Sequence, residues 1–184
     1  DDDLARLASL RPLAEKHTDA IVEDFYKLLL SHPETKKFFP DEATVRRVKR
    51  TQREYFLGLF AGKCDLAYVE DRLRVGTAHE RIGLATKWYL GAYNFFLRAV
   101  AVRLLEASPN EPHQAISAFL SLMKLVFFDI GLWVDTYVYA RESTMRKQQE
   151  AIRELSTPVL QIRERLLLLP IIGVIDTQRA RLIT

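Results

Sequence analysis

His79 differs from the other three histidines of this sequence in its neighbours. It lies near the end of an amphipathic segment, Gly83 follows four residues later, and Trp88 and Tyr93 belong to a segment rich in aromatic residues. An imidazole beside a large apolar pocket can hold an iron porphyrin, because haem iron takes its axial ligand from the protein and the pocket controls access to the metal. A histidine that serves only packing is compatible with the same spacing, so the residues alone leave both interpretations open.

Other kinds of chemistry have little support in the sequence. There is no Gly-x-Ser-x-Gly nucleophile motif and no phosphate-binding loop, and the carboxylates are scattered. Cys64 is the only cysteine, so no disulfide can form within the chain and no cluster of cysteines and histidines can hold a metal. His17, His32 and His113 lie in polar or turn contexts and are predicted to be structural. The sequence therefore predicts a protein that is not an enzyme.

The elements that would position His79 are helices, because apolar residues recur at three- and four-residue spacing through most of the first 155 residues. A short piece around Phe38 and Phe39 interrupts the pattern. Gly83 is expected to cap the helix that carries His79, and Thr86 to be the N-cap of the next helix, which ends near Ser108. The three earlier helices are predicted at Leu4–Leu30, Asp41–Phe60 and Leu66–Ile82.

The last helix is predicted to be unusually long, because no proline occurs between Pro112 and Pro158. A helix of ~45 residues would be ~65 Å long at 1.5 Å per residue. Its apolar face from Phe119 to Val138, with Trp133 near the centre, is the expected seam of a dimer. From Arg141 to Glu154 the helix becomes polar, with apolar residues seven apart, a pattern that favours weak pairing with a second copy.

Composition and charge limit the remaining function classes. The net charge of +3 is small and its positive charges are spread out, which disfavours nucleic-acid binding. No apolar run is expected to reach the ~20 residues of a membrane span, and no signal peptide is recognised, so we expect a cytoplasmic protein without a membrane partner. After Leu155 the pattern changes to alternation and then to an apolar run at Leu166–Ile175, which predicts two short strands.

The segment from His79 to Tyr93 resembles the proximal haem segment of the globin-coupled sensors, bacterial globins that report oxygen to an attached output domain. Members carry a proximal histidine followed by Ile-Gly-Leu, a Trp-Tyr pair and an aromatic helix, as at Ile82-Gly83-Leu84 and Trp88-Tyr89 here. The similarity extends over about the first 145 residues. It implies an all-α, three-over-three globin fold with an extra N-terminal helix and an extended C-terminal helix, binding haem b (iron protoporphyrin IX) with His79 as the metal ligand.

The resemblance also assigns the gas-binding side of the site. A Phe-Tyr pair some fifty residues before the proximal histidine is typical of the family, and Phe25-Tyr26 matches it, which implies that the Tyr26 hydroxyl points at the bound gas. Thr51 matches a distal threonine, while Val48 occupies the position where leucine is usual. Four aromatic residues are expected to line the haem pocket: Phe25, Phe39, Trp88 and Tyr93.

The tail resembles the opening of a STAS domain of the kind found in stressosome regulators. The resemblances together divide the chain into a globin sensor domain at 1–140, a signalling helix at 141–155 and the truncated start of a STAS output domain at 156–184. They imply a sensor of O2, which also binds CO and NO, forms a homodimer through its last two long helices and acts on STAS-type output partners. Two alternatives remain: a globin enzyme (a nitric oxide dioxygenase or a peroxidase-like protein), and a haem-free globin-like stressosome scaffold.

Overall fold

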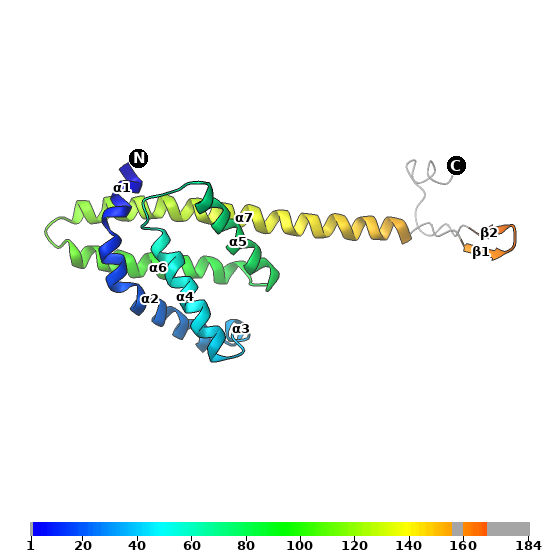
Figure 1. Cartoon of the computed structure of the whole chain (residues 1–184), viewed down its shortest axis with the longest axis horizontal. Coiled ribbons are helices and arrows are strands. Elements are labelled where there is room, and N and C mark those ends of the chain that lie inside the picture. Colours follow the sequence, from blue (N-terminus) through cyan, green and yellow to red (C-terminus); the bar gives the residue numbers. More distant parts are fainter. Residues whose placement is uncertain (1, 156–159, 169–184) are drawn as a thin grey trace. The chain divides into compact units, whose positions relative to one another are not determined.

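The computed structural model describes residues 2–155 and 160–168 (Figure 1). The chain divides into two units, Asp1–Tyr137 and Val138–Thr184. Seven helices and two short strands make up the described residues, which confirms the predicted all-α class for the first unit.

Residues 2–31 form two helices where one was expected, α1 (Asp2–Ser9) and α2 (Arg11–Ser31). Pro12 explains the break, because proline has no N–H to bond to the carbonyl of Ala8 and its ring obstructs a continuous helix. The same proline is tolerated in the first turn of α2, where N–H groups have no partner within the helix.

The next two helices begin at recognisable signals. α3 (Pro33–Lys36) is a single turn that precedes the Phe38–Phe39 pair. α4 (Glu42–Gly58) is capped by Asp41, whose side chain accepts a hydrogen bond from the Thr44 N–H at 2.6 Å. This helix ends two residues earlier than the predicted Phe60.

α5 (Leu66–Arg81) is capped by Asp65, which accepts a hydrogen bond from the Tyr68 N–H at 3.0 Å. In α6 (Thr86–Ala107) Thr86 is the first helical residue and Ala85 is the N-cap, so the prediction of a Thr86 cap was wrong. α7 (Pro112–Leu155) is one helix of 44 residues, as predicted.

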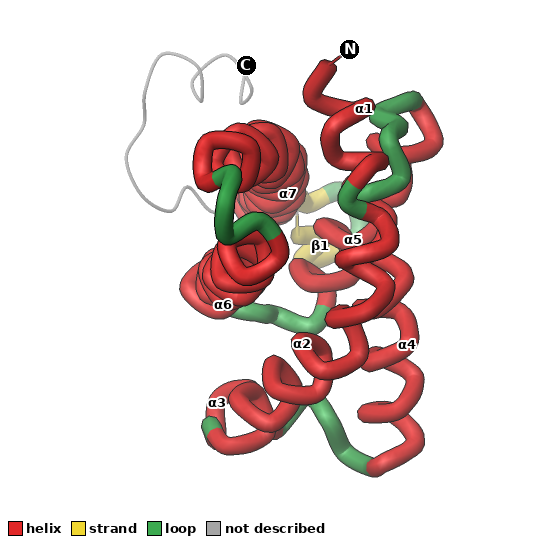
Figure 2. The backbone as a smooth tube through the Cα atoms, turned by 90° about the vertical axis from the view of Figure 1, so that its left-hand side faces the viewer, coloured by secondary structure: helices red, strands yellow, loops and turns green. Residues whose placement is uncertain are grey.

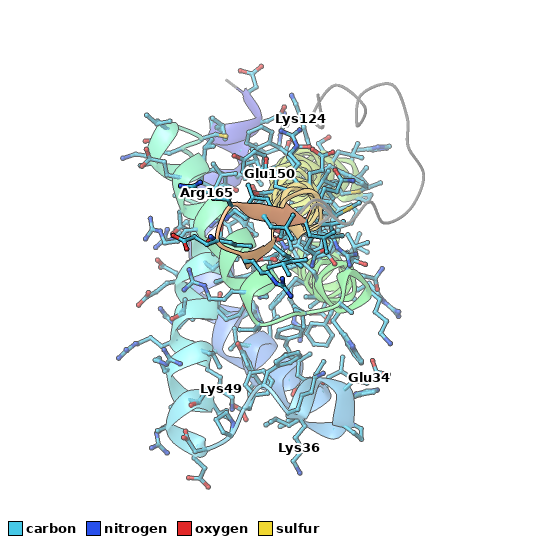
Figure 3. All side chains as sticks on the ribbon, turned by 90° about the vertical axis from the view of Figure 1, so that its right-hand side faces the viewer. Glu34, Lys36, Lys49, Lys124, Glu150 and Arg165 are labelled. Atoms are coloured by element: carbon cyan, nitrogen blue, oxygen red, sulfur yellow. The ribbon has the colours of Figure 1, made fainter. Side chains whose placement is uncertain are left out.

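The helices of the first unit pack in pairs. α2 and α4 are antiparallel, joined by ion pairs from Lys49 to Glu23 at 2.6 Å and from Arg53 to Asp19 at 2.7 Å. Figure 2 shows α6 and α7 side by side next to the layer that contains α2 and α4. Lys49, labelled in Figure 3, keeps 26% of its side chain exposed, and its partner Glu23 keeps 51% exposed. The ion pairs therefore lie at the rim of the α2–α4 contact, and the core lies between the layers.

The core of the first unit is aromatic. The Phe96 ring on α6 lies 4.8 Å from that of Phe25 on α2 and 5.1 Å from that of Phe56 on α4. Trp133 on α7 is only 2% exposed, so it belongs to this core. The prediction that Trp133 lies at the centre of a dimer seam was therefore wrong, because the ring is used to pack α7 against α6.

By length and composition, α7 is the one helix among the described residues that is apolar enough to cross a membrane. The expectation that no segment has this property was therefore wrong. In the first unit, Leu122, Val126 and Trp133 of this helix are buried in the core.

The second unit contains the last part of α7 and an antiparallel hairpin of β1 (Leu160–Arg163) and β2 (Leu166–Leu168). Val138, Met145 and Ile152 are exposed, and the hairpin lies where two strands were predicted. Most of the expected STAS segment, at residues 156–159 and 169–184, lies outside the described residues. The STAS assignment stays a prediction.

Candidate functional site

His79 lies in the last turn of α5, and one of its ring nitrogens is already bonded. Nδ1 is 2.8 Å from the carbonyl oxygen of Val75, one turn earlier on the helix. A carbonyl can only accept, so Nδ1 carries the proton and Nε2 keeps its lone pair. Histidines that bind metals characteristically donate their second nitrogen in this way, which fixes the ring orientation.

The surroundings of the His79 ring also favour the neutral form. Burial lowers the pKa of His79 below its ordinary value, and the bond to Val75 opposes this with a smaller effect. The ring makes an edge contact with Tyr89, with centroids 5.3 Å apart at 72°. A neutral imidazole with a free Nε2 is the form that binds a metal.

The backbone at His79 is held by the end of its helix. The Leu84 N–H donates to the His79 carbonyl at 3.0 Å, and the Gly83 N–H donates to the Glu80 carbonyl at 2.8 Å. This pair of bonds is the Schellman motif, which requires a left-handed residue, and Gly83 has φ of +69°. The predicted role of Gly83 as a cap is confirmed.

Gly76 lies three residues before His79 on α5. A Cβ added at Gly76 would lie 3.3 Å from the Thr136 side chain on α7. The glycine therefore allows α5 and α7 to approach closely.

A column of rings connects His79 to α7. Tyr89, which contacts His79, stacks on Trp133 with centroids 4.1 Å apart and planes inclined by only 12°. Trp133 in turn stacks on Tyr137 at 5.3 Å. Tyr89 was not predicted as a site residue, although its place four residues before Tyr93 on the same helix face was a signal that both rings point inward.

Tyr26 is buried in α2 among aromatic rings. Its ring contacts Phe25 at 5.5 Å and Phe39 at 5.6 Å, both in edge geometry. Burial raises the pKa of the Tyr26 hydroxyl above its ordinary value, so the group stays protonated and is a donor at neutral pH. Within the described residues this hydroxyl makes no hydrogen bond. A donor of this kind is available to a ligand.

The two α4 residues predicted for the gas-binding side lie in different environments. Val48 is half-buried and packs against the core. Thr51 is exposed, and its hydroxyl donates to the Arg47 carbonyl on its own helix at 3.3 Å. The role of Thr51 on the gas-binding side stays a prediction. It requires the Thr51 hydroxyl to leave the Arg47 carbonyl and to bond to the gas instead.

The four aromatic residues predicted to line the pocket are not gathered around His79. Trp88 is half-buried and donates from Nε1 to Glu34 at 3.1 Å, while its ring lies 5.3 Å from His32. Tyr93 is buried and its hydroxyl lies 2.5 Å from that of Tyr55. The other two, Phe25 and Phe39, pack around Tyr26.

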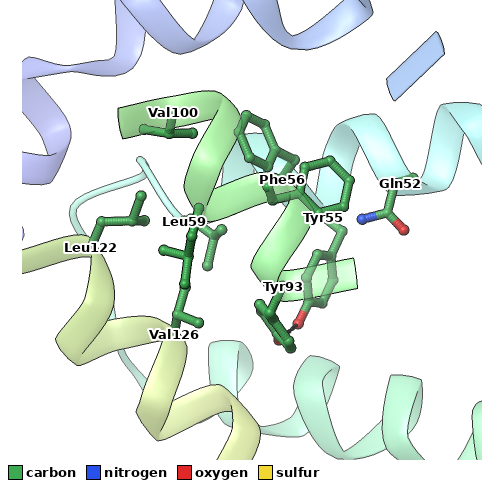
Figure 4. A pocket seen from close by; sticks show the side chains of 10 residues that line it. Gln52, Tyr55, Phe56, Leu59, Tyr93, Val100, Leu122 and Val126 are labelled. Carbon is green, nitrogen blue, oxygen red and sulfur yellow. Dashed lines mark hydrogen bonds between the residues drawn. The ribbon is translucent and has the colours of Figure 1, made fainter. Parts of the chain in front are cut away.

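A small cavity lies between α4, α6 and α7 (Figure 4). Its volume is about 20 Å³, which is room for about one water molecule, and Tyr55 and Tyr93 join hydroxyls at its edge. Its other lining residues are mainly apolar, among them Leu59, Val100 and Val126.

Beyond Tyr93 lies a buried polar cluster that was not predicted from the sequence. The Arg72 Nε donates to the Asp129 carboxylate at 2.9 Å, and both side chains are almost fully buried. The guanidinium lies between the rings of Tyr55 and Tyr68, 3.8 and 4.1 Å from their centroids. Asp129 was visible in the sequence only as a charge within an apolar run, which signals a buried partner.

The donor set determines which metal group fits. Among the described residues, no group of three or more His, Cys, Asp or Glu side chains could hold a metal ion. A porphyrin supplies four nitrogens of its own and requires one axial ligand from the protein. His79, neutral and with Nε2 free, fits that requirement, and Tyr26 offers a separate hydrogen-bond donor.

Comparisons with known proteins identify relatives of this chain. The chain is 35% identical over 168 residues to the heme-based aerotactic transducer HemAT of Halobacterium salinarum, an alignment that covers 86% of this chain and 34% of the relative. The chain therefore spans about a third of the length of that protein.

Solved structures show the same fold. The globin domain of the Geobacter sulfurreducens globin-coupled sensor matches with a TM-score of 0.70 and 28% identity, covering 74% of this chain and 90% of that one. The ferric globin domain of E. coli DosC matches with a TM-score of 0.58 and 12% identity, covering 76% of this chain and 89% of that one, which supports the fold alone. The predicted globin-like fold is confirmed. The protoglobin family model matches residues 1–143, and the chain therefore belongs to the protoglobin family.

Proposed function

We propose that this chain is a haem-based gas sensor domain that binds oxygen and passes the ligand state to an output domain through α7. The observation that carries the proposal is the His79 ring, with Nδ1 bonded to the Val75 carbonyl and Nε2 left for a metal. Haem iron, when held there, supplies the position at which a diatomic gas binds. The residues of the chain then hold the haem, select the gas and transmit its arrival.

Tyr26 is the proposed selector of the gas. Its hydroxyl is a protonated donor that makes no bond within the described residues. Of the two gases, oxygen would be the better hydrogen-bond acceptor at a haem site, so a hydrogen bond from Tyr26 would favour oxygen over carbon monoxide. A net hydrogen bond of about 1 kcal/mol corresponds to a several-fold change in affinity.

The column from His79 to Tyr137 supports transmission into α7. A change in the position of the His79 ring acts on Tyr89 and, through stacking, on Trp133. Packed aromatic rings in a dense core do not deform continuously, so such a change favours one discrete packing over another.

A homodimer through α6 and α7 is proposed from the apolar side chains that these helices leave exposed. On α7, Leu120, Phe127 and Val134 are seven residues apart and all exposed. On α6, Val102 and Leu105 are exposed as well. An apolar stripe with this spacing, on two neighbouring helices, suits a four-helix interface between two copies.

The wider context is also a proposal. We place the protein in the cytoplasm, with CO and NO as further ligands and with an output domain after α7, a STAS domain in this chain. The similarity to a protein named as an aerotactic transducer supports signalling over catalysis.

A visible spectrum of the purified protein with haem added tests the proposal. We expect a sharp Soret band at one haem per chain and a reversible change when oxygen is admitted to the reduced protein. Absence of stoichiometric haem binding would support the haem-free scaffold. Rapid turnover of nitric oxide, with no ligand-dependent change in α7, would support the enzyme.

A further inference from the structure

The helix that carries His79 meets α7 along one face. Arg72, Gly76 and His79 are four and three residues apart, so they lie on the same side of α5. Arg72 bonds to Asp129 on α7, and Gly76 lies against Thr136, about two turns further along α7. The two helices are therefore joined at the level of Arg72 as well as close to His79.

Asp129 is the centre of the first of these contacts. Its Oδ1 accepts a hydrogen bond from the Tyr68 hydroxyl at 2.7 Å, and its Oδ2 accepts from the Arg72 Nε at 2.9 Å. The Tyr55 hydroxyl lies 3.4 Å from Oδ2. Asp129 is 1% exposed and Arg72 is 3% exposed, so water has little access to replace these bonds.

Tyr55 brings a third helix into the cluster. It lies on α4, four residues after Thr51 and seven after Val48, which are predicted to face the gas. Its hydroxyl is bonded to that of Tyr93 and its ring covers the Arg72 guanidinium. The helix with His79 and the helix of the predicted gas-binding side thus converge on one carboxylate of α7.

We propose that Arg72 and Asp129 are positioning residues that connect α4 and α5 to α7, so that breaking their ion pair separates gas binding at the haem held by His79 from the response of α7. The proposal rests on the haem function proposed above. A buried ion pair with fixed hydrogen bonds is either formed or broken, which gives the connection two discrete states.

A positioning role of Arg72 and Asp129 can be distinguished from a purely structural one by removing the ion pair while keeping the fold. Replacing a buried ion pair by apolar residues of similar volume is often neutral for stability or even stabilising. The double variant Arg72→Met/Asp129→Leu can therefore keep the fold while it removes the charges and hydrogen bonds. A matched control is Arg53→Met/Asp19→Leu, which removes an ion pair of similar length between α2 and α4 at the surface.

The experiment measures amide hydrogen exchange of α7 between residues 129 and 137, in the haem-loaded protein with and without carbon monoxide. The resonance Raman band of the iron–imidazole bond is recorded for the same samples. We expect a gas-dependent change in α7 exchange for the wild type and the control. In the double variant we expect loss of that change, with haem and gas still bound and the imidazole band shifted.

Two results would overturn the proposal: the same gas-dependent change in the double variant as in the wild type, or gas binding by the wild type without any change in α7. If the double variant does not fold, Tyr68→Phe removes one donor to Asp129 and keeps the ring. A reduced gas-dependent change is expected there, and an unreduced one contradicts the proposal.

A haem-free measurement separates the two proposals. If the wild type binds no haem, the proposed function fails, and the connection is then tested by the NMR signals of the His79 ring in the haem-free protein. Arg72→Met/Asp129→Leu is expected to shift these signals, and the Arg53→Met/Asp19→Leu control to leave them in place. Unshifted signals in the double variant would show that the cluster does not position His79.

Discussion

The Nδ1–H of His79 donates to the carbonyl of Val75 at 2.8 Å, one helical turn earlier on α5. This bond determines which nitrogen of the ring is free. The bond between His79 and Val75 therefore prepares the ring as a metal ligand without a cofactor being present, because it fixes the tautomer and orientation of a neutral imidazole.

Gly83 is expected to hold His79 in place through the backbone. Gly83→Ala should lower the free energy of unfolding by about 1–2 kcal/mol, because a Cβ is disfavoured at a left-handed φ. An added Cβ there meets no atom within 4 Å, so the cost comes from the backbone alone. Urea unfolding measures it.

Gly91→Ala is the matched control, since an added Cβ at this helical position also meets no atom within 4 Å. It should raise stability by up to about 1 kcal/mol, because alanine favours helix. Equal effects of the two substitutions would contradict the assigned role of Gly83.

Tyr26→Phe is expected to speed oxygen release several-fold and to change carbon monoxide release less. The substitution keeps the ring and its contacts with Phe25 and Phe39, and removes one donor worth about 1 kcal/mol. Stopped-flow release kinetics of both gases measure the effect. Equal shifts for the two gases would mean that Tyr26 acts by steric contact.

Thr51→Val should have a smaller effect on oxygen release than Tyr26→Phe, because the Thr51 hydroxyl is exposed and bonded to the Arg47 carbonyl. The same stopped-flow series compares the two variants. A larger effect at Thr51 would show that this hydroxyl turns toward the gas.

The dimer is expected to depend on the exposed face of α7. Phe127→Glu should yield monomers by light scattering, because Phe127 is 61% exposed on the proposed interface. Trp133→Glu should instead unfold the domain, since it would bury a charge in the core. Leu66→Glu, at an exposed position on α5, is the control and should stay dimeric. A Phe127→Glu dimer would exclude this interface.

The haem-free protein should lose stability as the pH falls below about 6.5, the ordinary pKa of histidine. Burial lowers the pKa of His79 in the folded state, so the unfolded chain binds the proton first and is favoured by acid. The loss stops growing once the pH is below the folded pKa. In His79→Gln this part of the pH dependence should be absent, as measured by urea unfolding between pH 5 and 8.

The helices could be predicted from the sequence, because their signals are local. The Gly83 cap and the uninterrupted α7 depend on residue types and on the absence of proline. The break at Leu10 was missed although Pro12 gives a local signal for it. The N-cap of α6 was predicted at Thr86, one residue after the observed N-cap Ala85, since several residues before a helix can serve as the cap.

The site could be predicted only in part, because its remaining features depend on tertiary contacts. His79 and Tyr26 were identified through the resemblance to a family. Nothing in the sequence shows that Gly76 faces Thr136 or that Trp133 stacks on Tyr89. The partner of Asp129, Arg72, is 57 residues away in the chain and was not predictable from spacing.

The most direct test of the central claim is the Soret spectrum of His79→Ala, compared with the wild type and with His113→Ala. We expect the wild type and His113→Ala to bind one haem per chain, and His79→Ala to lose haem or hold it loosely. Imidazole added to His79→Ala should restore the wild-type band, because it supplies the missing ligand. A normal band and stoichiometry in His79→Ala without imidazole would contradict the assignment of His79 as the iron ligand.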